Sequence, residues 1–308
     1  MESEFVSWLR TRLPSSPWLR VGPGDDAAVL KSQDTLSDEI VTCDLLCDGV
    51  HFRVGQDSLR RIGRKALAVN LSDLAAMAAT PIAGFFAIAL PDDGSVAAEA
   101  IYEGMLPLAE HFSVAMAGGD TNVWAGPLVI SVTLTGRSDP EKALLRSGAC
   151  PGDHLLVTGR FGGSLLGHQF DFQPRIAEAL WLNEHHTLHA GIDCSDGLSL
   201  DVARLAQESG CGAAIDLQSV PIAEAAVEMT KRPGDTQSAL EHALGDGEDF
   251  ELLFAVPPND SQQILDHQPL DVPVTRIGTF IDQPGLWQIA AQGPIPLEPC
   301  GFLHRGGP

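Results

Sequence analysis

The stretch KALAVNLSDLAAM, residues 65–77, decides the fold. It forms the second half of a pattern over residues 57–77 in which apolar residues recur at helical spacing. Asp57 and Ser58 are candidate caps at its start, and Pro81 closes it. The sequence therefore predicts a long helix whose apolar face must be covered by a sheet or by other helices.

Predicted strands and helices alternate on both sides of this helix. In the first half of the chain, strands are expected at residues 39–46, 82–90, 114–117 and 128–136, with a second helix over 95–111. In the second half, strands are expected at residues 154–159, 190–193, 213–217 and 250–256, with helices between them. A turn-rich connection separates the halves. We expect two α+β or α/β domains, residues 1–138 and 139–308.

Composition limits the classes of function. The formal charge of -22 over 308 residues would repel a nucleic acid. No apolar run is long enough to cross a membrane, and the acidic start MESEF is unlike a secretion signal. We therefore expect a cytoplasmic protein with neither nucleic acid nor membrane as a partner.

Nucleophile and zinc signals are weak. The six cysteines form no CxxC pair and no cluster of zinc spacing, so we expect reduced and mostly buried thiols. Ser195 lies in IDCSDG, which lacks the GxSxG context of a serine nucleophile. The sequence gives little support to a covalent mechanism.

Aspartates beside small residues carry the chemical signal. They occupy five places in the chain: Asp25 and Asp26, Asp44, Asp73, Asp120, and Asp193 with Asp196. One Asp-Gly pair is usually a turn, but Asp73 interrupts an apolar helix, where an unpaired carboxylate is costly. Hard cations such as Mg²⁺ would remove that cost, with phosphate oxygens as further ligands. No Walker motif is present, so metal ions and arginine would have to meet the charge of a nucleotide polyphosphate.

These motifs together resemble the thiamine-monophosphate kinase family, in the superfamily of aminoimidazole ribonucleotide synthetase and selenophosphate synthetase. The resemblance covers nearly the whole chain and follows the family's order. The matching segments are GPGDDAAV (22–29), CDLLCDGVHF (43–52), KALAVNLSDLAAM (65–77), AGGDT (117–121), LLRSGACPGD (144–153), IDCSDGLSLD (192–201), GDGEDFELLF (245–254) and GFLH (301–304).

The resemblance implies transfer of the γ-phosphoryl group of ATP to thiamine monophosphate, giving thiamine diphosphate and ADP. It also implies several Mg²⁺ ions. The family's fold has an N-terminal mixed-sheet domain that forms a β-barrel between two subunits, and a C-terminal α/β sandwich-like domain. A homodimer follows from this resemblance.

The same resemblance implies the site residues. The family's magnesium positions fall on Asp26, Thr42, Cys43, Asp44, Asp73, Asp120, Asp193 and Asp196. Its ATP positions fall on Tyr102, Gly119, Asp120, Arg146 and Ser195. Its acceptor positions fall on His51, Glu248 and Phe302. Among them, we expect Asp44, Asp73 and Asp120 to hold the metals that bridge the reacting phosphates.

Three departures from the family's pattern and two alternatives stay open at this point. Ala78, in the stretch AMAATP, stands where the family usually has Gly. Cys43 stands where the family usually has Thr, and a thiol is a poor ligand for magnesium. GDGED stands at residues 245–249, where SGGED is common. The alternatives are another enzyme of the superfamily with a different small acceptor, and a non-catalytic magnesium–nucleotide sensor or scaffold.

Overall fold

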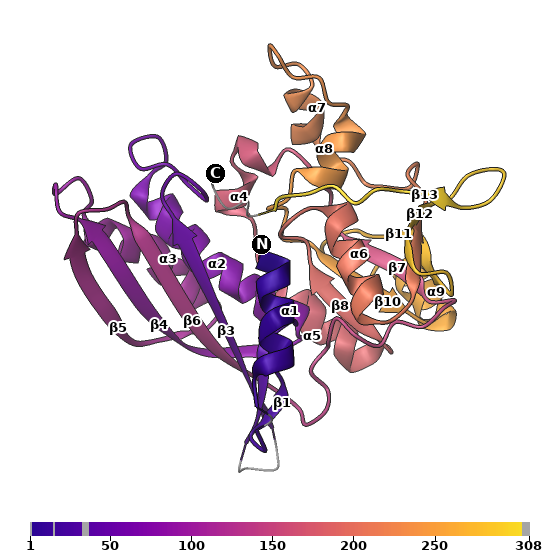
Figure 1. Cartoon of the computed structure of the whole chain (residues 1–308), viewed down its shortest axis with the longest axis horizontal. Coiled ribbons are helices and arrows are strands. Elements are labelled where there is room, and N and C mark those ends of the chain that lie inside the picture. Colours follow the sequence, from indigo (N-terminus) through magenta and orange to yellow (C-terminus); the bar gives the residue numbers. More distant parts are fainter. Residues whose placement is uncertain (1, 15, 33–36, 304–308) are drawn as a thin grey trace.

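The computed structural model describes residues 2–14, 16–32 and 37–303, and in it two mixed sheets lie side by side (Figure 1). The first sheet has the strand order β1-β2-β3-β6-β4-β5, with β4 and β5 parallel and the other pairs antiparallel. Its strands are β1 (Leu19–Val21), β2 (Ala28–Lys31), β3 (Asp38–Cys47), β4 (Thr80–Pro91), β5 (Ala115–Trp124) and β6 (Val129–Ser138). All the strands expected in the first half are present.

The second sheet has the order β13-β12-β9-β11-β7-β10-β8, and β12 and β9 are its parallel pair. Its strands are β7 (His154–Thr158), β8 (Ala190–Asp193), β9 (Gly212–Ile215), β10 (Leu252–Val256), β11 (Val274–Ile281), β12 (Gly285–Gln288) and β13 (Ile295–Pro296). Two mixed α+β layers confirm the predicted class, although the second sheet is mostly antiparallel. Strands β11, β12 and β13 are not among the strands expected from the sequence. Within the described residues of one chain, neither sheet closes into a barrel.

The helices pack between and around these sheets. They are α1 (Glu2–Arg12), α2 (Leu59–Ala76), α3 (Ala98–His111), α4 (His168–Asp171), α5 (Ile176–His185), α6 (Leu198–Glu208), α7 (Glu224–Met229), α8 (Ala239–Gly245) and α9 (Pro258–His267), with a 3₁₀ turn at Ser164–Leu166. In the part of the chain that the structure describes, none of them has the length and apolar character needed to cross a membrane.

Helix α2 is the centre of the molecule. It contacts the first sheet, α3, α4 and α5, and also β8 and β10 of the second sheet. Its contact with α3 depends on two glycines: a Cβ at Gly63 would lie 1.9 Å from the carbonyl oxygen of Ile101, and one at Gly104 would lie 1.8 Å from that of Arg60. One apolar cluster therefore runs through α2 from Val132 of the first sheet to Phe254 of the second. The long helix predicted from residues 57–77 is thus confirmed, and it joins the two halves.

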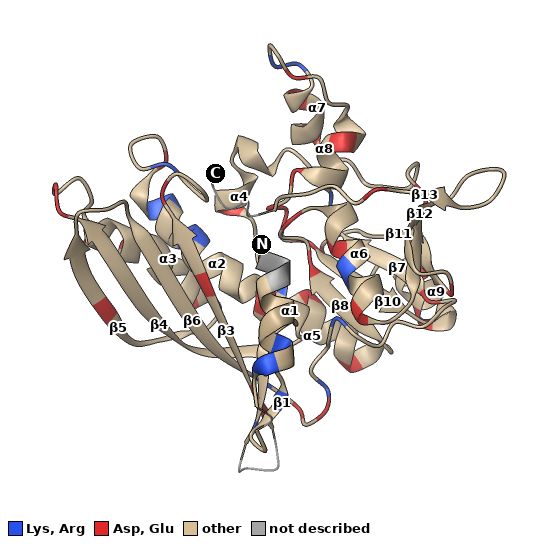
Figure 2. Cartoon of the chain, viewed as in Figure 1, with Lys and Arg blue, Asp and Glu red and all other residues tan. Residues whose placement is uncertain are grey.

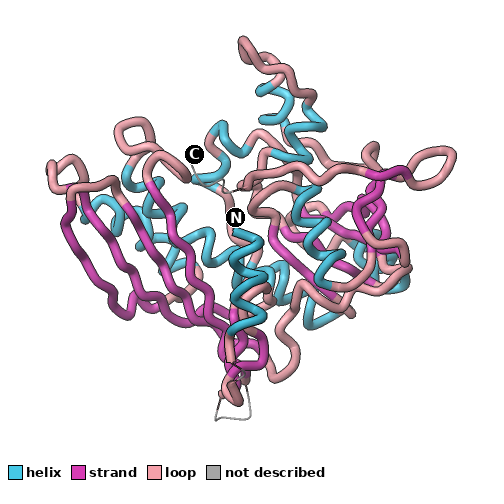
Figure 3. The backbone as a smooth tube through the Cα atoms, viewed as in Figure 1, coloured by secondary structure: helices cyan, strands magenta, loops and turns pink. Residues whose placement is uncertain are grey.

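The other face of the first sheet is open. Figure 3 shows helices on only one side of it. Large apolar side chains on the open side are exposed, among them Leu45 (57%), Phe85 (48%) and Trp124 (45%). A patch of this kind on a sheet is typical of an interface with another chain.

The expectation of mostly buried cysteines is wrong. Cys43, Cys150 and Cys300 are exposed, whereas Cys194 and Cys211 are buried. Strand alternation places Cys43 on the open face of β3, and the other two exposed thiols lie in loops. All six are free thiols, as expected.

Candidate active site

Three aspartates from distant parts of the chain meet where α2 faces the second sheet. Asp26 comes from the GPGDD loop, Asp73 from the last turn of α2 and Asp193 from the end of β8. One carboxylate oxygen from each lies within 4.8 Å of the others. Figure 2 shows acidic segments on the loops at the centre of the molecule, where the two halves meet. The main chain thus gathers carboxylates that would repel one another without a counterion.

Burial and mutual repulsion shift the protonation of this cluster. Burial, with the charges of Asp44, Asp193 and Asp26, raises the pKa of Asp73 well above its usual value. Burial and the Asp26 charge do the same to the pKa of Asp193. Burial and the charges of Asp26 and Asp196 raise the pKa of Asp44 to about 6. The structure therefore brings together five of the predicted metal positions: Asp26, Asp44, Asp73, Asp193 and Asp196.

Hydroxyl groups orient two of these carboxylates. Thr42 Oγ1, on the α2 side of β3, donates a hydrogen bond to Asp73 Oδ2. Ser72 Oγ donates to Asp193 Oδ2 at 2.5 Å. The remaining oxygens of both carboxylates can therefore turn toward a shared ligand. Ser72 is not among the residues predicted from the sequence, although its place directly before Asp73 in the long helix was a usable signal.

Arg146 supplies positive charge at one side of the cluster. Its Nη2 lies 2.5 Å from Asp26 Oδ1, and its backbone N–H donates to Asp25 Oδ1 at 3.2 Å. Asp26 Oδ2 and Arg146 Nε are both buried and have no hydrogen-bond partner. A buried carboxylate oxygen without a donor is costly, and a hard cation would satisfy it. The residues present therefore fit Mg²⁺, and the Arg146 fork fits phosphate oxygens.

Asp196 is held at the second side of the cluster by another arginine. Arg204 Nη1 contacts Asp196 Oδ2 and lies 2.8 Å from Asp201 Oδ1. Asp201 also accepts the backbone N–H groups of Asp196 and Gly197, which fixes the loop before α6. Arg204 is not among the residues predicted from the sequence; the available signal was its position two helical turns after the Asp196 loop.

Two of the three predicted acceptor residues, Glu248 and Phe302, lie beside Asp196. The Glu248 backbone N–H donates to the Ser195 carbonyl oxygen at 2.7 Å, and the Phe302 N–H donates to that of Asp196 at 2.8 Å. His51 Nδ1 accepts the backbone N–H of Cys47 at 3.0 Å. This contact fixes the neutral tautomer with its proton on Nε2, so the ring can act as a hydrogen-bond donor. His304, the last residue of GFLH, lies outside the described residues.

Four predicted residues are not brought to this cluster within one chain. Asp120 and Gly119 lie on the edge strand β5, and the Cys43 thiol lies on the open face of β3, where it accepts from Thr133 Oγ1 at 3.2 Å. The Tyr102 ring packs edge-on against Phe86, with 6.1 Å between the ring centroids. Local packing alone requires a glycine at position 119, because a Cβ there would lie 1.9 Å from the Phe86 carbonyl oxygen.

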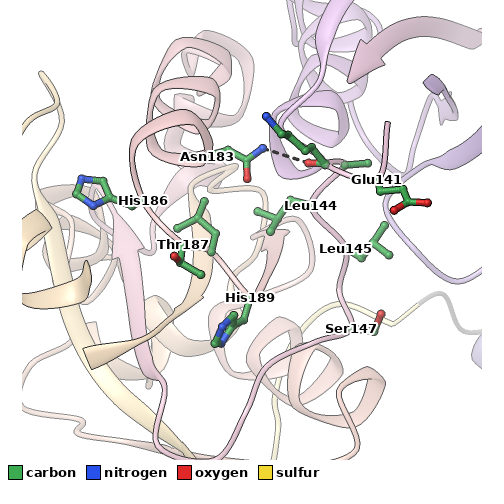
Figure 4. Close-up of a pocket in the computed structure, with 11 residues that line it drawn as sticks. Glu141, Leu144, Leu145, Ser147, Asn183, His186, Thr187 and His189 are labelled. Atoms are coloured by element: carbon green, nitrogen blue, oxygen red, sulfur yellow. Dashed lines mark hydrogen bonds between the residues drawn. The ribbon is translucent and has the colours of Figure 1, made fainter. Parts of the chain in front are cut away.

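A separate pocket lies away from the carboxylates. It has a volume of about 400 Å³ and is lined by residues 141–145, Ser147, Asn183 and residues 186–189 (Figure 4). Asn183 Nδ2 closes one side by donating to the Lys142 carbonyl oxygen at 3.1 Å. None of the predicted site residues lines it. The chemistry suggested by the sequence therefore belongs to the acidic cluster and not to this pocket.

Comparison with known proteins identifies the family of this chain. The model of the AIR synthase related protein N-terminal domain matches residues 24–138, and that of the C-terminal domain matches residues 151–286. The thiamine-monophosphate kinase of Rhodopirellula baltica is 43% identical over 312 residues, covering 99% of this chain and 97% of the relative. The chain belongs to the thiamine-monophosphate kinase family. The family member from Escherichia coli strain K12 is 35% identical over 94% of this chain and 93% of its own length.

Solved structures of family members share the fold. AaThiL complexed with AMPPCP and TMP superposes with a TM-score of 0.84 at 25% identity, over 99% of this chain and 97% of that one. Thiamine-monophosphate kinase from Stenotrophomonas maltophilia K279a has a TM-score of 0.72 at 34% identity, over 92% and 94% of the two chains. The hydrogenase maturation protein HypE of E. coli, at 21% identity and a TM-score of 0.71, shares the fold alone.

Proposed function

We propose that this chain transfers the γ-phosphoryl group of ATP to thiamine monophosphate, giving thiamine diphosphate and ADP. The cluster of Asp26, Asp73 and Asp193 carries the proposal. Carboxylates gathered in this way can bind divalent cations, and such cations neutralise the charge of a polyphosphate. Family membership supports the reaction, and the AaThiL complex supports the two substrates. A cytoplasmic location and a domain boundary near residue 138 stay predictions.

Mg²⁺ is the metal that this donor set fits. Asp26, Asp44, Asp73, Asp193 and Asp196 would hold it, with the Thr42 hydroxyl orienting Asp73. When bound, the metal would neutralise the polyphosphate and draw the two anionic substrates together. Five carboxylates carry more charge than one divalent ion can balance, which supports several ions.

The remaining chemistry is positioning. The acceptor is a phosphate monoester that is mostly dianionic near neutral pH, so it needs no general base. Arg146 offers a planar fork to nucleotide phosphates, and Ser195 lies in the loop beside Asp196. His51 offers Nε2–H to the acceptor, and Glu248 and Phe302 lie next to the same loop.

We propose further that two copies form the working enzyme, through the open face of the first sheet. Asp120 pairs in register with Ala87, on the exposed face. Asp44 lies on the opposite face of the sheet and three strand spacings away, about 14 Å. If Asp120 serves a metal site, the site it can reach is that of a second copy packed on this face. The same packing would cover Phe85 and Trp124 and could close the intersubunit barrel.

Product analysis tests the proposed reaction. The protein is mixed with ATP, Mg²⁺ and thiamine monophosphate, and ADP and thiamine diphosphate are quantified. Equal amounts of both products are expected, and chelation of the metal should abolish them. Asp73→Asn should be inactive, whereas Asp216→Asn, which alters a turn-capping aspartate bonded to Ser219 Oγ, should keep full activity. ADP formation without thiamine diphosphate would indicate another acceptor, and no ADP formation at all would indicate a sensor or scaffold.

A further inference from the structure

Lys65, the first residue of the motif KALAVNLSDLAAM, is completely buried. Its side chain is 0% exposed, and it is among the largest completely buried side chains. An ammonium group in such a place is costly unless each of its three hydrogens finds an acceptor. Burial accordingly lowers the pKa of Lys65, although the charge of Glu248 opposes the change.

The three acceptors of Lys65 come from three separate segments. Lys65 Nζ donates to the His51 carbonyl oxygen at 2.8 Å, to Gln169 Oε1 at 2.5 Å and to Glu248 Oε1 at 2.6 Å. The Phe170 ring centroid lies 5.2 Å from the same nitrogen. One ammonium group therefore ties the loop after β3 to the loop before β10, across both halves of the molecule.

Two of these three segments carry the proposed acceptor residues. His51 and Glu248 are the side chains expected at the acceptor. Glu248 adopts φ +56°, a left-handed conformation that is uncommon for a residue with a side chain. Its N–H bond to Ser195 and its ion pair with Lys65 hold it there. The Glu248 side chain is 22% exposed while that of Lys65 is 0% exposed, so the carboxylate lies between the lysine and the solvent-facing side.

We propose that Lys65 is a positioning residue for the acceptor substrate, which orients the His51 loop and the Glu248 carboxylate without touching the substrate itself. The inference rests on the proposed function, because it concerns how that same site receives thiamine monophosphate. Lys65 also balances the Glu248 charge, so a phosphate dianion approaching the site meets a neutral pair and not a lone carboxylate. A lysine that served only core stability would affect both substrates equally.

Steady-state kinetics of four variants tests this role. Lys65→Met keeps the length of the side chain and removes the charge. We expect its KM for thiamine monophosphate to rise about tenfold or more, since one partner of a buried charge pair is lost, while its KM for ATP changes less than about twofold. Glu248→Gln should have a similar effect. The double variant should raise the acceptor KM by much less than the product of the two single effects.

Unfolding temperatures separate positioning from stability. Lys65→Met leaves Glu248 unpaired and should lower the unfolding temperature, and adding Glu248→Gln should restore part of it without restoring the acceptor KM. Arg20→Met is the matched control: it breaks an ion pair with buried Asp38, 3.0 Å long, at the opposite end of β3. It should lower the unfolding temperature and leave both KM values unchanged.

The outcomes also separate this inference from the proposed reaction. Equal changes in both KM values, or a lower unfolding temperature with an unchanged acceptor KM, would refute the role of Lys65 while wild-type turnover still supported the reaction. A wild-type protein that makes no thiamine diphosphate would refute both.

Discussion

The carboxylate oxygens of Asp73 and Asp193 lie within 4.8 Å of each other although one is on helix α2 and the other ends a strand of the second sheet. Each is buried or half-buried, and the pKa of each is well above its usual value because of burial and neighbouring acidic charges. The boundary between the two halves is therefore electrostatically unfavourable at neutral pH until cations arrive. Metal binding and the stability of this boundary should be coupled.

Magnesium should stabilise the protein even without substrates. Because the folded chain gathers the ligands and the unfolded chain does not, Mg²⁺ at about 100 times its Kd should add about 2.7 kcal/mol to the free energy of unfolding. Asp73→Asn should lose most of this gain. Without metal, the same variant should be at least as stable as the wild type, because it removes repulsion. Thermal unfolding with and without Mg²⁺ measures both effects.

Asp216→Asn is the control for that experiment, since it changes an aspartate in a surface turn. It should keep the full magnesium response. An Asp73→Asn protein that responded to Mg²⁺ as the wild type does would show that the ion binds elsewhere.

The magnesium response should depend on pH. The pKa of Asp44 is raised to about 6, by burial and then by Asp26 and Asp196, from about 4 in an unfolded chain. A raised folded pKa means that the protonated group stabilises the metal-free fold below about pH 4, and that this stability is lost as pH rises through 6. Mg²⁺ competes with those protons. The gain in unfolding temperature on adding Mg²⁺ should therefore grow from pH 5 to about pH 7, and it should grow less in Asp44→Asn.

Arg146 should affect nucleotide binding more than metal binding. It pairs with Asp26 through Nη2 at 2.5 Å, so without nucleotide it competes with cations for that carboxylate. Arg146→Gln should raise the KM for ATP about tenfold, by removing a charge-assisted contact to phosphate. Its affinity for Mg²⁺ alone should stay equal or increase. Titration calorimetry measures the affinity for Mg²⁺, and steady-state kinetics measures the KM for ATP. Weaker Mg²⁺ binding in Arg146→Gln would contradict the proposed competition.

The sequence predicted the central helix and most strands because their hydrophobic periodicity is local. Residues 57–77 form α2 almost as expected, and Asp73 is half-buried between the buried residues Ser72 and Leu74. The strand β11, residues 274–281, was not predicted because TRIGTF lacks a long apolar run. Its strand conformation depends on pairing with β7 and β9. Pairing between distant segments leaves little trace in one sequence.

The site was predictable as a list but not as an arrangement. The motifs indicated Asp26, Asp44, Asp73, Asp193 and Asp196, and the fold brings these five together. Nothing in the spacing showed that Asp120 lies on the opposite face of the first sheet, because that depends on the register between β4 and β5. Nor did it show that Lys65 reaches Glu248, 183 residues away.

The open face of the first sheet should hold two copies together. Phe85→Glu places a charge on a side chain that is 48% exposed on this face, and a dimer would have to desolvate that charge. Sedimentation equilibrium should show a dimer for the wild type and a monomer for this variant. Val227→Glu, at a residue 44% exposed on α7, is the control and should remain dimeric. A monomeric wild type would remove the proposed interface.

Mixing two inactive variants tests whether Asp120 acts across that interface. Asp73→Asn disables the acidic cluster of its own copy but still supplies Asp120, and Asp120→Asn does the reverse. After the subunits exchange, half of the dimers combine one of each, and one of the two sites in such a dimer has all of its native carboxylates. The mixture should therefore regain about a quarter of wild-type turnover. If Asp120 served only its own copy, each copy in the mixture would lack one carboxylate and the mixture would stay inactive. Recovery measured by thiamine diphosphate formation thus decides which copy Asp120 serves.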